Sequence, residues 1–298
     1  MNVLITGNNG YIGSFLIDRL HKRSLLNTNE INIVVYDAKF EKLNADNLKN
    51  IDAVVHLAGY TNAKESFNET KILNELNINK TISFIDLCKN VGIKMFIFPS
   101  TSSVYGVDGE SEVFEDDDLV INPQSPYAEA KFVIEKYIIS NLGKKTKFLI
   151  PRFGSVFGIS KNMKYHTAIN KFCLSAVKGE PLLLWKDNYS QERPYVDLET
   201  VLHYILFSLN KFTEPNKSLM SYWNNTYNVV SVNIKLKSII EIITKIKPDV
   251  KLEFEKGPLV NQFSYKVSTQ KLESTGFKMK NKIEETIRET IMTIDNLI

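Results

Sequence analysis

Tyr127 and Lys131, four residues apart, are the pair in this chain best suited to proton transfer. Ser125 can cap a helix that has Pro126 in its first turn, and such a helix would place both side chains on one face. A free phenol has a pKa of about 10, and a neighbouring ammonium lowers that pKa toward the range useful for general acid–base catalysis. Tyr and Lys at this spacing are common on helices, so a second feature is needed to indicate a catalytic site.

That second feature is a hydroxyl-rich segment at residues 100–103, directly after a predicted strand over residues 94–98. Ligands of parallel sheets bind at the carboxyl ends of the strands. A hydroxyl leaving this strand would therefore meet the Tyr127 phenol over a bound cofactor.

Three glycines, Gly7, Gly10 and Gly13, follow a predicted first strand over Asn2–Thr6 and open a predicted helix over residues 11–22. Glycines allow a tight turn and bring backbone N–H groups against a pyrophosphate. The helix N-terminus adds a partial positive charge for the phosphates. The spacing predicts a dinucleotide site at the start of the chain.

The second predicted strand, over residues 31–36, leads into Asp37. A carboxylate at this place accepts hydrogen bonds from the adenosine ribose and repels a 2′-phosphate. Asp37 therefore favours NAD over NADP, although Lys39 could contact a 2′-phosphate.

Short apolar runs alternate with helical patterns through the first half of the chain, which is typical of a parallel sheet covered on both faces. We expect an α/β protein with a Rossmann-type doubly wound parallel sheet in residues 1–155. Residues 156–298 are expected to form mainly a smaller, mixed α/β substrate-binding lobe that partly interleaves with the first. The remaining predicted segments are strands at residues 53–57, 94–98, 147–150, 182–185 and 226–230, and helices at residues 70–90, 126–141, 165–178, 198–209, 236–245 and 283–296.

The composition excludes several classes of protein. The 37 basic and 34 acidic residues leave a net charge of only +3, which argues against a nucleic-acid-binding surface. No apolar run reaches the roughly 18 residues of a membrane span, and no signal-peptide pattern is present, so we expect a cytoplasmic protein. No metal-binding spacing is found, and Cys88 and Cys173 are expected to be buried free thiols.

The glycine spacing resembles the GxxGxxG pattern of the extended short-chain dehydrogenases/reductases, the NAD-dependent epimerase/dehydratase family. Similar landmarks recur over roughly residues 1–290. They lie at residues 56–59 (His-Leu-Ala-Gly), 77–81 (Asn-x-x-x-Thr), 104–106 (Val-Tyr-Gly), 152–158, 193–197, 227–229 and 272–277.

The resemblance implies a catalytic set of Thr101, Tyr127 and Lys131, in which Thr101 is aligned through the Val-Tyr-Gly and Ser100 is the rival. His56 is expected to be a packing residue. Arg193 is implied to hold the substrate diphosphate, with Ser102 and Ser103 also at the substrate. The implied NAD-binding residues are Gly7, Asn9, Gly10, Tyr11, Ile12, Gly13, Asp37, Leu57, Ala58, Gly59, Asn77 and Lys131. Arg152 begins a segment implied to line the nicotinamide and the substrate.

The resemblance further implies hydride transfer at a sugar carbon, C4 in most members, of a nucleotide-diphosphate sugar. A 4-epimerase is favoured, with an NAD(P)H-dependent 4-keto reductase as the alternative. Family 4,6-dehydratases carry an acidic pair where this chain has Ser102 and Ser103, which disfavours dehydration. A non-catalytic cofactor-binding protein is disfavoured because Tyr127 and Lys131 are both present. A homodimer is implied, paired through the helices at residues 70–90 and 126–141.

Overall fold

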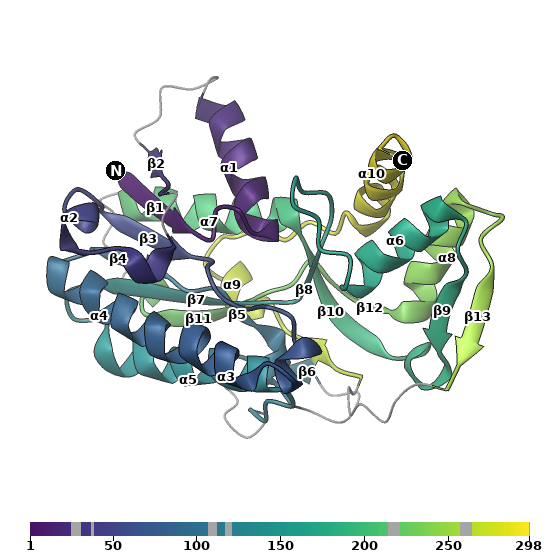
Figure 1. Cartoon of the computed structure of the whole chain (residues 1–298), viewed down its shortest axis with the longest axis horizontal. Coiled ribbons are helices and arrows are strands. Elements are labelled where there is room, and N and C mark those ends of the chain that lie inside the picture. The colour runs from purple at the N-terminus through teal and green to yellow at the C-terminus, as the bar shows by residue number, and fades with distance from the viewer. Residues whose placement is uncertain are drawn as a thin grey trace.

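The computed structural model describes residues 1–24, 31–36, 39–106, 112–116, 121–213, 221–256 and 264–297 (Figure 1). Its centre is a parallel sheet with the strand order β11-β7-β4-β3-β1-β2, and β5 (Ser100–Thr101) also pairs with β7. The strands are β1 (Asn2–Thr6), β2 (Asn32–Val34), β3 (Ala53–His56), β4 (Met95–Ile97), β7 (Lys147–Phe153) and β11 (Asn225–Val229).

Helices cover both faces of this sheet because successive strand residues point to opposite sides. Val3 and Ile5 of β1 pack with α1 (Tyr11–Ser24) and α7 (Leu198–Thr213). Leu4 packs instead with α4 (Thr81–Val91) and α5 (Pro126–Asn141). Figure 1 shows α1 and α7 above the sheet and α4 and α5 below it. The predicted doubly wound architecture is therefore confirmed.

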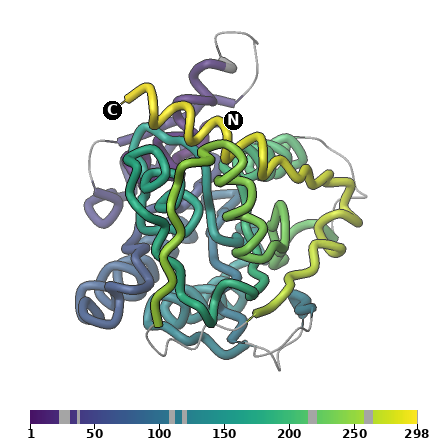
Figure 2. The backbone as a smooth tube through the Cα atoms, turned by 90° about the vertical axis from the view of Figure 1, so that its right-hand side faces the viewer, coloured from purple at the N-terminus to yellow at the C-terminus, as the bar shows by residue number. Residues whose placement is uncertain are grey.

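The second lobe packs three helices, α6 (Ala168–Lys178), α8 (Leu236–Ile246) and α10 (Ile283–Asp295), against small sheets. Figure 2 views this side, with α10 running across the top in yellow. The three-stranded sheet has the order β12-β10-β8, and a second sheet pairs β9 with β13. Its strands are β8 (Ser155–Phe157), β9 (Leu182–Trp185), β10 (Glu192–Asp197), β12 (Val232–Lys235) and β13 (Leu252–Glu255). Shorter elements are α2 (Ala45–Leu48), α3 (Thr70–Leu73), α9 (Gln270–Glu273), and the paired β6 (Glu112–Val113) and β14 (Lys266–Val267).

The two halves of the sequence interleave. Strand β11 forms one edge of the main sheet, and α7 covers one face of this sheet. Both elements come later in the chain than the first elements of the second lobe. Cys88 and Cys173 are both buried and free, as predicted. In the described ranges, no helix is both long and apolar enough to cross a membrane.

The predicted helix at residues 70–90 consists of α3, a π-helical segment (Asn74–Lys80) and α4. The wider π turn buries Asn77, whose side-chain amide accepts a hydrogen bond from the Tyr60 N–H and donates one to the Tyr60 carbonyl, both at 2.7 Å. Such turns often occur at functional sites. Here the turn fixes the loop that follows β3.

His56, at the end of β3, is a core residue, as expected from its apolar strand. Its ring is fully buried among Phe40, Phe84, Phe96 and Phe98, and its Nδ1 shares a hydrogen bond of 2.8 Å with the Thr6 hydroxyl. Burial, with a smaller contribution from the Lys131 charge, lowers the pKa of His56 to about 3. The imidazole therefore stays neutral in the folded protein.

A buried ion pair joins α5 to β7. The Arg152 guanidinium donates to both carboxylate oxygens of Glu135, with the shortest contact at 2.7 Å, and both side chains are at most 5% exposed. The same carboxylate accepts the Ser100 hydroxyl, and Arg152 also donates to the Tyr105 phenol at 2.8 Å. This network links α5, β5 and β7 beneath the carboxyl ends of the strands.

We predict that His56→Phe makes the protein more resistant to acid. Below about pH 6.5 the unfolded chain binds a proton that folded His56 cannot bind, so stability falls by about 1.4 kcal/mol per pH unit from this residue alone, until the pH nears its folded pKa. Urea unfolding at several pH values should give a shallower loss of stability between about pH 6 and pH 4 for the variant. Parallel curves for the variant and the wild type would show that His56 does not contribute.

We predict that Glu135→Ala destabilises the protein by about 3–5 kcal/mol, because the Arg152 charge loses its buried counter-ion. Chemical denaturation measures this change. The double variant Glu135→Ala/Arg152→Met should be more stable than Glu135→Ala alone, since it removes the stranded charge. If the double variant lost as much free energy of unfolding as the two single variants lose in total, this interpretation would be contradicted.

Candidate active site

A cavity of about 1780 Å³ lies at the carboxyl ends of the main-sheet strands. Its walls come from the segments after β1, β3, β4 and β7, and from the second lobe. A pocket for one small molecule usually measures about 300–1,000 Å³. The cavity therefore has room for a dinucleotide together with a second ligand.

The glycine-rich turn forms the cavity wall at the N-terminus of α1. Gly7 has a φ of +70°, and a Cβ on it would lie 2.6 Å from the Ala58 nitrogen. A Cβ on Gly13 would lie 2.1 Å from the Gly7 carbonyl oxygen, so neither position accepts a side chain without movement. This close turn, followed directly by a helix N-terminus, fits the diphosphate of a dinucleotide.

Most of the predicted cofactor-binding residues line this cavity. Asn77 supports the Tyr60 backbone from behind and is absent from the cavity wall. Asp37 lies outside the described residues, whereas Lys39 is on the wall. The predicted residues on the wall are Gly7, Asn9, Gly10, Tyr11, Ile12, Gly13, Leu57, Ala58, Gly59 and Lys131.

Lys131 is held firmly from the sheet side. Its ammonium donates a hydrogen bond of 2.8 Å to the Pro99 carbonyl and lies 4.4 Å from the centre of the Phe98 ring. Burial lowers the pKa of Lys131 to about 8, while Glu135 opposes the shift and the Lys164 charge adds to it. The strand end therefore fixes the position of the ammonium relative to the rest of the cavity.

Tyr127 lies one turn earlier on α5, on the cavity wall. Ser125 caps the helix by accepting the Ala128 N–H at 3.2 Å, as the sequence predicted, and Pro126 occupies the first turn. Burial raises the pKa of Tyr127 to about 12, so the lowering expected from a nearby ammonium is absent from the protein alone. The cause is desolvation of the phenolate by burial.

The structure separates the roles of the four hydroxyl residues after β4. Ser100 and Thr101 both border the cavity. Ser100 is buried and donates to the Glu135 carboxylate, whereas Thr101 is partly exposed on the cavity wall. Ser103 also lines the cavity. Ser102 is buried next to the Tyr265 phenol at 3.4 Å and is absent from the cavity wall, so its predicted substrate contact is not seen. Thr101 is thus favoured over Ser100.

The two arginines of the predicted site differ. Arg193, on β10, lines the cavity and donates to the Gln191 side chain at 2.8 Å. Burial lowers its pKa, which shows the cost of holding this cation away from water. The segment over residues 152–158 was expected to line the nicotinamide and the substrate. Residues 153–156 of it line the cavity, whereas Arg152 itself is buried against Glu135.

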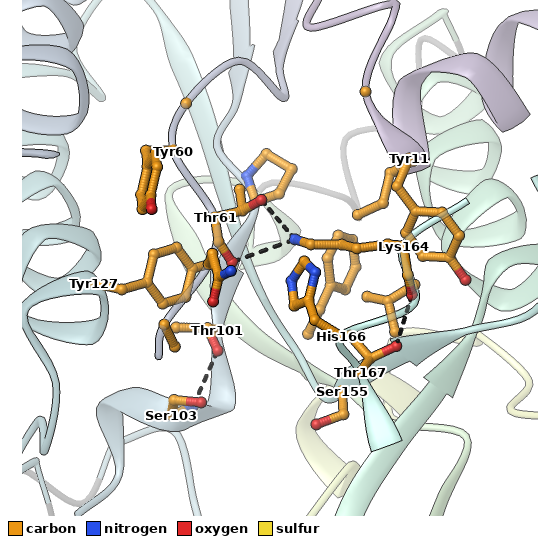
Figure 3. Close-up of a pocket in the computed structure, with 18 of the residues that line it drawn as sticks. Tyr11, Tyr60, Thr61, Thr101, Ser103, Tyr127, Ser155, Lys164, His166 and Thr167 are labelled. Atoms are coloured by element: carbon orange, nitrogen blue, oxygen red, sulfur yellow. Dashed lines mark hydrogen bonds between the residues drawn. The ribbon is translucent and has the colours of Figure 1, made fainter. Parts of the chain in front are cut away.

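Sequence reasoning missed a segment of the second lobe, residues 158–167, that crosses the cavity and is called the strap below. Residues 165–167 were predicted to be helical, but α6 begins only at Ala168. Lys164 and His166 project from the strap into the cavity and face Tyr127 and Thr101 across it (Figure 3). No spacing rule identifies such residues, because tertiary contacts position them. Within the described ranges, no cluster of three His, Cys, Asp or Glu residues could hold a metal ion.

Comparison with solved structures supports this architecture. MoeE5 in complex with UDP-glucose and NAD superposes with a TM-score of 0.84 over 100% of both chains, at 19% identity. A UDP-N-acetylglucosamine 4-epimerase of Methanobrevibacter ruminantium gives a TM-score of 0.84 over 100% of this chain and 99% of its own, at 24% identity. At these identities the likeness establishes the fold.

Sequence comparison establishes the family. A relative from Methanocaldococcus jannaschii is 25% identical over 320 residues, covering 99% of this chain and 98% of its own. The UDP-glucose 4-epimerase of Lactobacillus helveticus is 26% identical over 248 residues, covering 73% of this chain and 74% of its own. The model of the NAD dependent epimerase/dehydratase family matches residues 3–229. The chain belongs to this family of NAD-dependent enzymes.

Proposed function

We propose that the protein is a 4-epimerase of a UDP-sugar. The observation that carries the proposal is the position of Thr101, Tyr127 and Lys131 on the wall of one cavity that also contains the glycine-rich turn. The similarity to the UDP-glucose 4-epimerase of Lactobacillus helveticus supports the choice of reaction and of nucleotide.

In this proposal Tyr127 moves the proton of the C4 hydroxyl. The Tyr127 phenolate accepts that proton when the C4–H bond breaks, and the C4–O bond becomes a ketone. This step requires the positive charges of the complete site to lower the pKa of Tyr127 from about 12. NAD, when held at the glycine-rich turn, would supply the hydride acceptor and donor for C4. The Thr101 hydroxyl holds the sugar oxygen, and the Lys131 ammonium stabilises the phenolate. The keto sugar then rotates within the cavity and presents its opposite face. Tyr127 returns the proton to the C4 oxygen, and the C4 epimer forms.

Two other reactions of the family fit the cavity less well. Elimination of water from a sugar needs an acid and a base next to the catalytic threonine. Here Ser102 is buried beside Tyr265, and Ser103 offers only a hydroxyl. A 4-keto reductase uses the same three residues and remains the second candidate. The contacts between the strap and the glycine-rich turn, at 2.7 and 2.8 Å, favour retention of the cofactor and thus the epimerase.

We also propose that the enzyme is a homodimer. Ile72 on α3 and Ile139 on α5 are 50% and 53% exposed, although apolar residues on these helices also pack inward. A second apolar face on neighbouring helices suits a two-fold pairing of identical surfaces.

We predict that the purified protein carries NAD and interconverts UDP-glucose and UDP-galactose without added cofactor. Tyr127→Phe should keep the bound NAD but lose the activity by at least about 100-fold, the typical contribution of a positioned acid–base group. Tyr137→Phe is the matched control, because this tyrosine of the same helix bonds Asp86 and does not line the cavity. Acid extraction and product chromatography measure the two properties. Consumption of NADPH on a 4-keto sugar nucleotide, with no retained NAD, would replace the epimerase with a reductase.

A further inference from the structure

The strap is fastened to the glycine-rich turn on one side of the cavity. The Ser160 hydroxyl donates to the Tyr11 carbonyl at 2.7 Å, and the Asn162 side chain donates to the Asn9 carbonyl at 2.8 Å. The Tyr11 phenol in turn donates to the Gly158 carbonyl at 2.6 Å. The strap therefore starts on the turn that accepts the cofactor diphosphate.

Lys164 extends from the strap to the opposite wall. Its ammonium donates to the Thr61 hydroxyl at 2.5 Å and to the Thr61 carbonyl at 3.2 Å, in the loop after β3 (Figure 3). Buried Asn170 fixes the backbone below it by donating to the Lys164 carbonyl at 3.1 Å and accepting the Gly158 N–H at 3.1 Å. The ammonium is thus held at the β3 loop by Thr61, while the strap that carries it is fastened to the β1 turn.

The Lys164 charge has no acidic counterpart in the part of the chain that the structure describes. No described carboxylate lies within 4.0 Å of its nitrogen, and its two acceptors are the neutral oxygens of Thr61. Burial lowers the pKa of Lys164 to about 8. A desolvated cation of this kind is stabilised when an anion enters the cavity.

We propose that Lys164 binds the diphosphate of the NAD cofactor and closes the strap over it. The glycine-rich turn is the expected site of that diphosphate, and the strap is hydrogen-bonded to this turn two residues before Lys164. Arg193 lines the cavity from β10 and is the cation proposed for the substrate diphosphate. Lys164 is therefore a cofactor-binding residue supplied by the second lobe, and the inference holds for either sugar reaction.

The test is the dissociation constant of NAD, measured by titration calorimetry on protein stripped of cofactor. Lys164→Gln keeps a donor for Thr61 and removes the charge, and it should weaken NAD binding about 10- to 100-fold. Lys164→Arg keeps the charge and should stay within about threefold of the wild type by the same reasoning. Lys178→Gln, an exposed lysine at the end of α6 that is absent from the cavity wall, is the matched control and should change the affinity by less than about twofold.

Binding of UDP to the NAD-loaded protein separates the two sources of diphosphate. Lys164→Gln should leave the UDP affinity within about threefold of the wild type. Unchanged NAD affinity with weakened UDP binding would assign the ammonium to the substrate and overturn the proposal. Unchanged affinity for both ligands would show that Lys164 makes only a structural contact, and this result would also overturn the proposal. Because binding is measured and not turnover, neither result depends on the proposed epimerase activity.

Discussion

The buried pair of Arg152 and Glu135 is the interaction on which the active site depends. It fastens α5 to β7 through charge-assisted hydrogen bonds in a water-poor interior, where an unpaired charge would be strongly destabilising. Lys131 and Tyr127 lie one and two turns before Glu135, respectively, on the same face of α5, since the three are spaced by four residues. The Ser100 hydroxyl bonds the same carboxylate. One carboxylate thus helps to fix both the helix with the phenol and the strand end that leads to Thr101.

A second constraint comes from the interleaving of the two lobes. The glycine-rich turn and the Tyr60–Thr61 loop belong to the first lobe, while the strap and Arg193 belong to the second. Hydrogen bonds join residues 158–162 of the strap to the turn around Tyr11, and another joins Lys164 to Thr61. These bonds connect the two lobes across the cavity. Efficient hydride and proton transfer requires reacting groups held to within a fraction of an ångström. The hydrogen bonds that the lobes share around the glycine-rich turn are contacts that can serve this requirement.

Local signals in the sequence predicted a large part of this arrangement. The bounds of β1 and α5 agree with the prediction, because a continuous apolar run and a Ser-Pro cap are local features. Thr101, Tyr127 and Lys131, the predicted catalytic set, line one cavity, and their catalytic roles stay a prediction. The π turn around Asn77, the burial of Ser102 and the pairing of Arg152 were not predicted, since each depends on partners distant in sequence. Lys164 was missed for the same reason, because its contact with Thr61 joins residues about 100 positions apart.

The most direct test of the central claim is the fate of the hydrogen at C4. UDP-glucose that carries deuterium at C4 is incubated with the wild-type enzyme in ordinary water, with no added cofactor, and the product is analysed by mass spectrometry and NMR. A closed cavity that keeps its NAD should return the same deuterium, so UDP-galactose should retain the full label at C4. Loss of the label, or the absence of any C4 epimer, would contradict the account of a retained cofactor served by Tyr127.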